Sequence, residues 1–178
     1  YQGEVMSDIT VPRTVPQYIS GSFNAQNVTG WSWSELRNVN FLIQNNHNPA
    51  IPEPARNHFT GIARLFRAWY YFDMVKQYGD VPWYGKAMDV NDPDLYKPKD
   101  SRVLVMDSVL NDLDFAIANI YSVKDNTATQ VTKWTALALK SRICLFEGTF
   151  RKYHNIEAAS AAAWFEEAAE AASELMGS

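Results

Sequence analysis

The sequence predicts an all-α fold in which irregular helical hairpins, similar to tetratricopeptide repeats, stack as an α-α superhelix. Apolar residues recur at steps of about three and four through most of the chain after residue 32, which is the spacing of amphipathic helices. No segment alternates apolar and polar residues convincingly at a period of two, so no strand is expected. The connections differ in length, and the strict tetratricopeptide period of about 34 residues is absent. The stack is therefore expected to be irregular.

The chain is expected to contain two regions. Residues 1–32 are predicted to form an irregular N-terminal segment, because Pro12, Pro16 and Gly21 interrupt a stretch that is rich in Asn, Ser and Thr. Residues 33–178 are predicted to form the helical-repeat region.

The first hairpin is expected to pair a helix over residues 33–47 with a helix over about 53–78. An Asn-Pro pair stops the first helix, and Gly79 stops the second. The second helix carries large apolar side chains around most of its circumference, which predicts burial between several neighbours. Trp69 is accordingly expected in the core, and its replacement by Ala is expected to cost about 3–5 kcal/mol of stability.

A polar loop over about 83–100 leads to the second hairpin, which is expected to pair helices over residues 101–121 and 132–147. Gly148 is predicted to lie just past the end of the latter helix, where glycine commonly terminates helices. A final alanine-rich helix is expected over about 156–176, and its small residues allow another helix to approach closely.

Charge and composition exclude several classes of function. The chain carries 16 Lys and Arg against 20 Asp and Glu, whereas a nucleic-acid-binding domain is normally basic, so no nucleic acid partner is expected. The single cysteine, Cys144, excludes an internal disulfide and a cysteine-based zinc site, and is expected to be a small buried hydrophobe. His47, His58 and His154 lack the spacing of a metal-binding motif, so neither a metal nor another cofactor is expected.

The protein is not expected to be an enzyme, because its sequence offers no catalytic constellation. Asp112 and Asp114 stand two residues apart on a helix and point in different directions, so they cannot flank one glycosidic bond. No nucleophile elbow, phosphate-binding loop or dinucleotide-binding motif occurs. Arg64 and Arg67 are expected to be buried arginines bonded to a carboxylate or to a helix end.

The most distinctive segment of the chain is LFRAWYYFDMVKQYGDVP at residues 65–82. A Trp-bearing helix start at residues 33–40 precedes it, a helix with the pattern Asp-Leu-Asp-x-Ala follows within residues 101–116, and a further helix and turn lie at residues 131–154. In this order, the four segments resemble the SusD/RagB family, which are outer-membrane nutrient-binding lipoproteins of Bacteroidetes. The resemblance covers most of residues 33–154.

The resemblance implies a non-catalytic protein that binds a nutrient, most often an oligosaccharide or polysaccharide, at the cell surface. Such proteins form a lid over a TonB-dependent outer-membrane transporter of the SusC type and pass the ligand to it. The helices are implied to face the transporter, and the loops opposite them to hold the ligand. The resemblance also implies membrane contact through an N-terminal lipid anchor that is absent from this chain. It implies further that the chain is the N-terminal helical portion of a family member, truncated at its C-terminus.

Two other functions remain open on the sequence alone. One is a helical-repeat scaffold that docks a protein partner and has no small-molecule ligand of its own. The other is an all-α glycoside-processing enzyme, which would need two carboxylates that converge on one bond. The sequence offers no obvious pair of this kind.

Aromatic residues in loops are the best candidates for ligand contact, because a pyranose stacks its apolar face on an indole or phenol ring. Its hydroxyl groups are then bound by polar side chains such as Asn. The candidate ligand-binding residues are Trp31, Tyr18, Asn24, Trp83 and Tyr84. For Trp31 the alternative is packing against the first helix, and for Trp83 and Tyr84 it is a cap on the ends of the long helices. No catalytic residue and no metal ligand is assigned.

Overall fold

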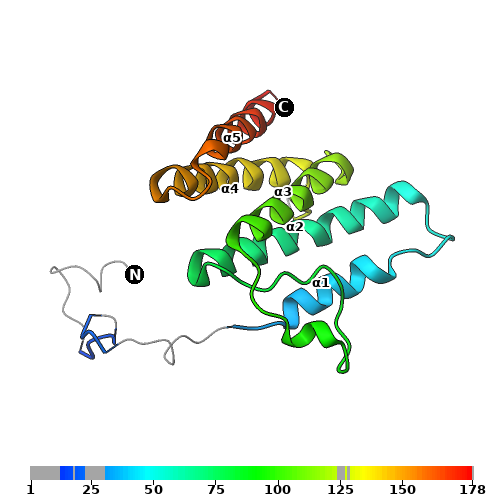
Figure 1. Cartoon of the computed structure of the whole chain (residues 1–178). Helices are drawn as coiled ribbons and strands as arrows, with labels where there is room; N and C mark the ends of the chain where they lie inside the picture. The colour runs from blue at the N-terminus through cyan, green and yellow to red at the C-terminus, as the bar shows by residue number, and fades with distance from the viewer. Residues whose placement is uncertain (1–12, 18, 23–30, 124–126, 128, 178) are drawn as a thin grey trace. The chain divides into compact units, whose positions relative to one another are not determined.

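The computed structural model describes residues 13–17, 19–22, 31–123, 127 and 129–177, and these residues confirm the predicted all-α class. Within them the only bridge between extended segments is the isolated antiparallel pair of Val81 and Asp100. In chain order the elements are α1 (Ser34–Asn45), α2 (Glu53–Tyr78), η3 (Pro93–Tyr96), α3 (Arg102–Asn119), α4 (Lys133–His154), η4 (Ala158–Ser160) and α5 (Ala161–Met176), as Figure 1 shows. No helix in this described part combines the length and the apolar character that a membrane span requires.

The chain divides into two compact units, residues 1–33 and residues 34–178. In the first unit, the described residues include a turn in which the backbone N–H groups of Ile19 and Ser20 both donate to the carbonyl of Pro16, at 3.0 and 3.1 Å. All of the helices that the structure describes lie in the second unit.

Each helix of the second unit packs mainly on its neighbours in the sequence. α1 lies on α2, α2 on α3, α3 on α4 and α4 on α5, and Figure 1 shows this order from α1 in cyan to α5 in orange and red. Most of the largest fully buried apolar side chains come from the three middle helices, and these include Leu65, Tyr71, Val75, Met106, Val109, Leu113, Leu137 and Ile143. Cys144 is also buried, as predicted, and burial raises the pKa of its thiol to about 12.

The prediction that α4 ends before Gly148 is wrong, because the helix continues to His154. Gly148 instead faces α5: a Cβ atom at this position would lie 2.9 Å from the ring of Phe165. The glycine therefore permits a close helix approach and does not stop the helix. Asn155, in the left-handed conformation with φ of 55°, provides the C-cap.

The prediction that α5 begins near residue 156 is also wrong. A short 3₁₀ turn, η4, intervenes, and α5 begins at Ala161. Glu157, at the start of this turn, has a positive φ of 46°, which is incompatible with a continuous helix from Ile156.

The prediction that Trp69 lies in the core is wrong as well, since 49% of its surface is exposed. Phe59 and Phe66 are exposed too, and both lie on the same face of α2, seven residues apart. The helix is apolar most of the way round, as the sequence indicates, but its described neighbours cover only part of the circumference. One aromatic face of α2 is left uncovered by the described residues.

Candidate functional site

The loop over residues 79–100 carries two of the predicted ligand-binding residues, and its two ends are fastened together. The backbone N–H of Asp100 donates to the carbonyl of Val81 at 3.2 Å, and the Asp100 carboxylate accepts from the backbone N–H of Trp83 at 2.7 Å. Lys97 donates to the same carboxylate at 2.6 Å. Burial raises the pKa of Asp100, but the hydrogen bonds from Lys97 and Trp83 outweigh this and hold the pKa below its usual value.

Tyr71 of α2 forms hydrogen bonds to the backbone of this loop at two positions. Its hydroxyl donates to the carbonyl of Pro82 at 3.2 Å and accepts from the backbone N–H of Tyr84 at 2.6 Å. The residue is completely buried, and this burial raises the pKa of its phenol well above the ordinary value, so the hydroxyl keeps its proton. A single side chain thus fixes the backbone on both sides of Trp83.

Arg67 joins the helices beneath the loop. Its guanidinium makes a two-pronged ion pair with Asp112 of α3, with N···O distances of 2.6 and 2.7 Å, and the two residues stand 45 positions apart. The remaining nitrogen donates to the side-chain oxygen of Asn40 in α1 at 2.9 Å and to the carbonyl of Gly85 at 3.0 Å. The prediction of a buried arginine bonded to a carboxylate is therefore confirmed for Arg67.

Asn40 completes this buried network from α1. Its amide nitrogen donates to the carbonyls of Tyr84 and Lys86, at 2.8 and 3.0 Å. Because the amide oxygen accepts from Arg67, both ends of this side chain are engaged. Three helices and the loop over residues 79–100 thus share one set of hydrogen bonds, which gives this part of the molecule a defined backbone geometry.

The structure places the two aromatic residues of this loop differently. Tyr84 is only 9% exposed, and its hydroxyl donates to the carbonyl of Leu95 at 3.3 Å. Trp83 is half-buried, with its ring 4.3 Å from the ring of Tyr71 and 5.2 Å from the Arg67 guanidinium. Trp83 therefore keeps more surface than Tyr84 for a ligand, although both residues pack on the helices.

The remaining predicted ligand-binding residues belong to the first unit. Trp31 is 37% exposed, and its ring lies 5.2 Å from that of Trp33. Tyr18 and Asn24 lie outside the described residues. Trp31 and Trp83 belong to different units, so the structure gives no geometry between them.

A second buried ion network joins α3, α4 and η4, and sequence reasoning missed it. Glu147 is completely buried; one of its oxygens accepts from Arg102, 45 positions earlier, and the other from Arg151 at 2.8 Å. Arg151 also donates to Asp107 at 2.8 Å and to the Ser160 hydroxyl at 2.9 Å. Burial lowers the pKa of Arg151, but the bonds to Glu147 and Asp107 outweigh it and raise the pKa above its usual value. The Glu147 carboxylate is held between two arginines, each bonded to a different oxygen.

The pair Asp112 and Asp114 behaves as the helix spacing predicts. Asp112 is buried against Arg67, whereas Asp114 is half-exposed and pairs with Lys140 of α4 at 2.6 Å. Among the residues that the structure describes, no group of three or more His, Cys, Asp or Glu side chains could hold a metal ion.

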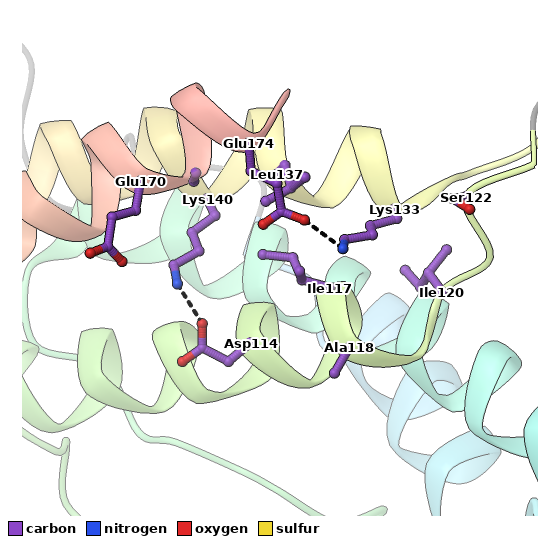
Figure 2. A pocket seen from close by; sticks show the side chains of 11 residues that line it. Asp114, Ile117, Ala118, Ile120, Ser122, Lys133, Leu137, Lys140, Glu170 and Glu174 are labelled. Atoms are coloured by element: carbon purple, nitrogen blue, oxygen red, sulfur yellow. Dashed lines mark hydrogen bonds and ion pairs between the residues drawn. The ribbon is translucent and has the colours of Figure 1, made fainter. Parts of the chain in front are cut away.

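A groove of about 320 Å³ lies between α3, α4 and α5, and Figure 2 shows the side chains that line it. Lys140 reaches Asp114 at 2.6 Å and Glu167 at 2.5 Å, and Lys133 reaches Glu174 at 2.5 Å. Burial lowers the pKa of Lys140, but its bonds to Asp114 and Glu167 outweigh the effect of burial and hold the pKa above its usual value. Both lysines already have carboxylate partners, so neither is available as an unpaired cation for a ligand in this groove.

The chain matches a SusD-like protein family, described as "Starch-binding associating with outer membrane", over residues 8–145. A SusD-like protein from Formosa agariphila, P38, is 29% identical over 154 residues, which are 82% of this chain and 30% of that protein. The chain thus spans about a third of the length of this relative.

Solved structures resemble the chain as well. A SusD-like protein from Bacteroides fragilis NCTC 9343 is 25% identical, with a TM-score of 0.64 over 79% of this chain and 25% of that one. A second structure, described as containing a xylogluco-oligosaccharide, is 23% identical, with a TM-score of 0.73 over 93% of this chain and 33% of that one. The predicted tetratricopeptide-like helical fold is confirmed by this likeness.

Proposed function

Because this chain belongs to the SusD-like family, we propose that it takes part in the non-catalytic binding of glycans or oligosaccharides at the cell surface. The observation that carries the proposal is the family match over residues 8–145. It is supported by the relative whose structure is described with a xylogluco-oligosaccharide.

Trp31 and Trp83 are the proposed stacking platforms for the sugar. An indole offers a flat apolar face, which suits the apolar face of a pyranose, and both residues keep part of their surface exposed. Tyr18 and Asn24 remain proposed ligand contacts in the first unit. Tyr84 has the smallest exposed surface of the described candidates, so its proposed role is to hold the backbone next to Trp83 in place.

The absence of catalysis is part of the proposal. Glycoside hydrolysis needs two carboxyl groups on either side of one bond, one of which must give or take a proton. The two most deeply buried carboxylates of the described residues, Asp112 and Glu147, are instead bound by arginines. Both are better suited to holding helices together than to moving protons.

Delivery of the ligand to a SusC-like TonB-dependent transporter completes the proposed function. The family description, which places starch binding in association with the outer membrane, supports this location. Attachment through an N-terminal lipid anchor, with the helices facing the transporter, belongs to the same proposal.

The alternative function is a helical-repeat scaffold that docks a protein and has no small-molecule ligand. One observation favours it: Phe59, Phe66 and Trp69 expose an aromatic face on α2. Exposed apolar patches on soluble proteins commonly mark interaction sites.

Calorimetric titration of the chain with starch-, laminarin- and xyloglucan-derived oligosaccharides tests the proposal, with products followed by chromatography. We expect binding without cleavage, and a loss of about tenfold in affinity, or about 1.4 kcal/mol, for Trp31→Ala. Tyr153→Ala, which removes a strongly exposed aromatic residue that is not a candidate, is the matched control and should bind as the unaltered chain does.

Three results would contradict this proposal. Release of shorter products would show an enzyme. Unchanged affinity of Trp31→Ala would assign Trp31 to packing. Retention of an outer-membrane barrel protein without binding of any oligosaccharide would favour the scaffold.

A further inference from the structure

A groove lies at the N-terminal end of α2, and Trp83 is not among the residues that line it. We propose that it is a second subsite for a neutral sugar unit, with Tyr121 as its stacking platform. The proposal rests on the glycan-binding function proposed above. The groove has a volume of about 540 Å³, within the range of about 300–1,000 Å³ that small-molecule sites occupy. The first turns of α2 line one side, and the end of α3 with the residues after it lines the other.

Tyr121 gives the groove an aromatic surface. Its ring stacks on the ring of His58, with centroids 4.0 Å apart and planes inclined by only 5°. The side chain is nevertheless 47% exposed and lines the groove, so the stacking on His58 leaves part of its surface accessible. An aromatic ring that is held by stacking on one side and keeps exposed surface is the arrangement that a sugar-stacking residue needs.

The backbone around Tyr121 is held in place by side chains and backbone of two other helices. The N–H of Tyr121 donates to Nδ1 of His58 at 3.1 Å, and its carbonyl accepts from the N–H of Lys133 at 3.0 Å. The carbonyl of Ser122 accepts from the indole N–H of Trp134 at 2.9 Å. These bonds fix an otherwise irregular segment before any ligand arrives, which lowers the entropic cost of binding.

His58 is well suited to this role in its neutral form. Because its Nδ1 accepts a hydrogen bond, the ring proton must lie on Nε2. Burial lowers the pKa of His58, which favours the same neutral state. Close packing of α2 on α3 supports the arrangement, since a Cβ atom at Gly61 would lie 2.9 Å from the side chain of Ile120.

The groove also offers hydrogen-bonding groups that have no partner in the described structure. The side chains of Asn57 and Glu53 make no hydrogen bond or ion pair there, and Asn119 uses only its nitrogen, which donates to the carbonyl of Phe115 at 2.8 Å. An amide, a carboxylate and a second amide oxygen beside an aromatic ring are the groups that bind the hydroxyls of a sugar.

The charge of the groove selects the class of ligand. Glu53 carries the one carboxylate among the described residues that line it, and none of these residues is basic, so an acidic sugar would meet a like charge. Neutral sugar units avoid this repulsion. The groove of Figure 2 differs, because its two lysines, Lys133 and Lys140, already pair with carboxylates.

Nuclear magnetic resonance can locate the ligand, because the indole N–H of Trp134 is bonded to the groove wall at Ser122. Xylogluco- and laminari-oligosaccharides would be titrated into the nitrogen-15-labelled chain, with the Trp134 indole signal assigned through Trp134→Phe. We expect this signal to shift, and we expect Tyr121→Ala to lose about tenfold in affinity at this site while Tyr121→Phe retains it. Thermal unfolding of each variant checks that the fold is intact.

The outcomes separate this subsite from the general function. If an oligosaccharide binds but the Trp134 signal does not move, or moves equally in Tyr121→Ala, the subsite is disproved and glycan binding stands. If no oligosaccharide of either series binds to any variant, both proposals fail. An oligogalacturonate that binds to this groove as tightly as the neutral sugars would overturn the assigned ligand class.

Discussion

At the scale of single residues, the ion pair of Arg67 and Asp112 joins α2 to α3 and reaches the loop over residues 79–100. Both side chains are buried, and all the polar atoms of the pair lie in a low-dielectric interior. Removing one partner of such a pair leaves the other charge buried without compensation, which costs far more than losing an exposed ion pair.

We therefore expect Asp112→Asn to lower the free energy of unfolding by about 3–5 kcal/mol. The matched control is Asp73→Asn, which removes the carboxylate from the exposed ion pair of Asp73 and Lys76 within α2. This change should cost about 1 kcal/mol or less. Denaturant unfolding at neutral pH measures both values. Equal losses for the two variants would show that burial of the Arg67 pair adds nothing.

The sequence predicts that Arg67 is bonded to a carboxylate, but not to which one. Helical spacing shows which residues share a face of one helix, whereas Asp112 lies 45 positions away on another helix. The same limit explains why the partners of Glu147 could not be predicted. Pairing between helices depends on how they cross, and no local pattern records that.

At the scale of elements, the crossing of α4 and α5 depends on Gly148. Glycine just past a helical stripe commonly ends a helix, which is why the sequence predicts a stop there. The same absence of a side chain serves a second purpose, close packing, and the structure shows that Gly148 serves this one. The two uses are indistinguishable until the neighbouring helix is placed.

We expect Gly148→Ala to destabilise the protein by about 1–3 kcal/mol, because the added methyl group would overlap the ring of Phe165. In an open helix the same change would stabilise by up to about 1 kcal/mol. The control is the same substitution in a Phe165→Ala background, where the cost should largely disappear, as a double-mutant cycle of unfolding free energies would measure. A stabilising effect of Gly148→Ala in the unaltered background would refute this account.

At the scale of the whole molecule, the helix order and fold class follow from periodicity, but which faces are buried does not. The sequence marks α2 as apolar nearly all round and so predicts a buried Trp69. In the described structure α1 and α3 cover part of the helix, and the face with Phe59, Phe66 and Trp69 stays open. The same limit applies to the candidate ligand-binding residues. Position in a loop predicts ligand contact for Tyr84 as well as for Trp83, yet the side chain of Tyr84 packs into the core.

Comparison of two tryptophans tests this placement. We expect Trp164→Ala to cost about 3–5 kcal/mol, because Trp164 is only 4% exposed, whereas Trp69→Ala should cost about 1–2 kcal/mol. Thermal and denaturant unfolding of the two variants give the values. Equal costs would mean that α2 buries the face that the structure leaves open.

The two arginine–carboxylate bonds across successive helices have a consequence for how the second unit holds together. Arg67 reaches forward to Asp112 and Arg102 reaches forward to Glu147, each across 45 positions, so each bond ties a helix to the next one along. In a linear stack of this kind, the free energy of unfolding is approximately a sum of contributions from the single helices and from the interfaces between neighbouring helices. Local unfolding that begins at α5 therefore has to break the Arg102–Glu147 link between α3 and α4 before it reaches α1 and α2.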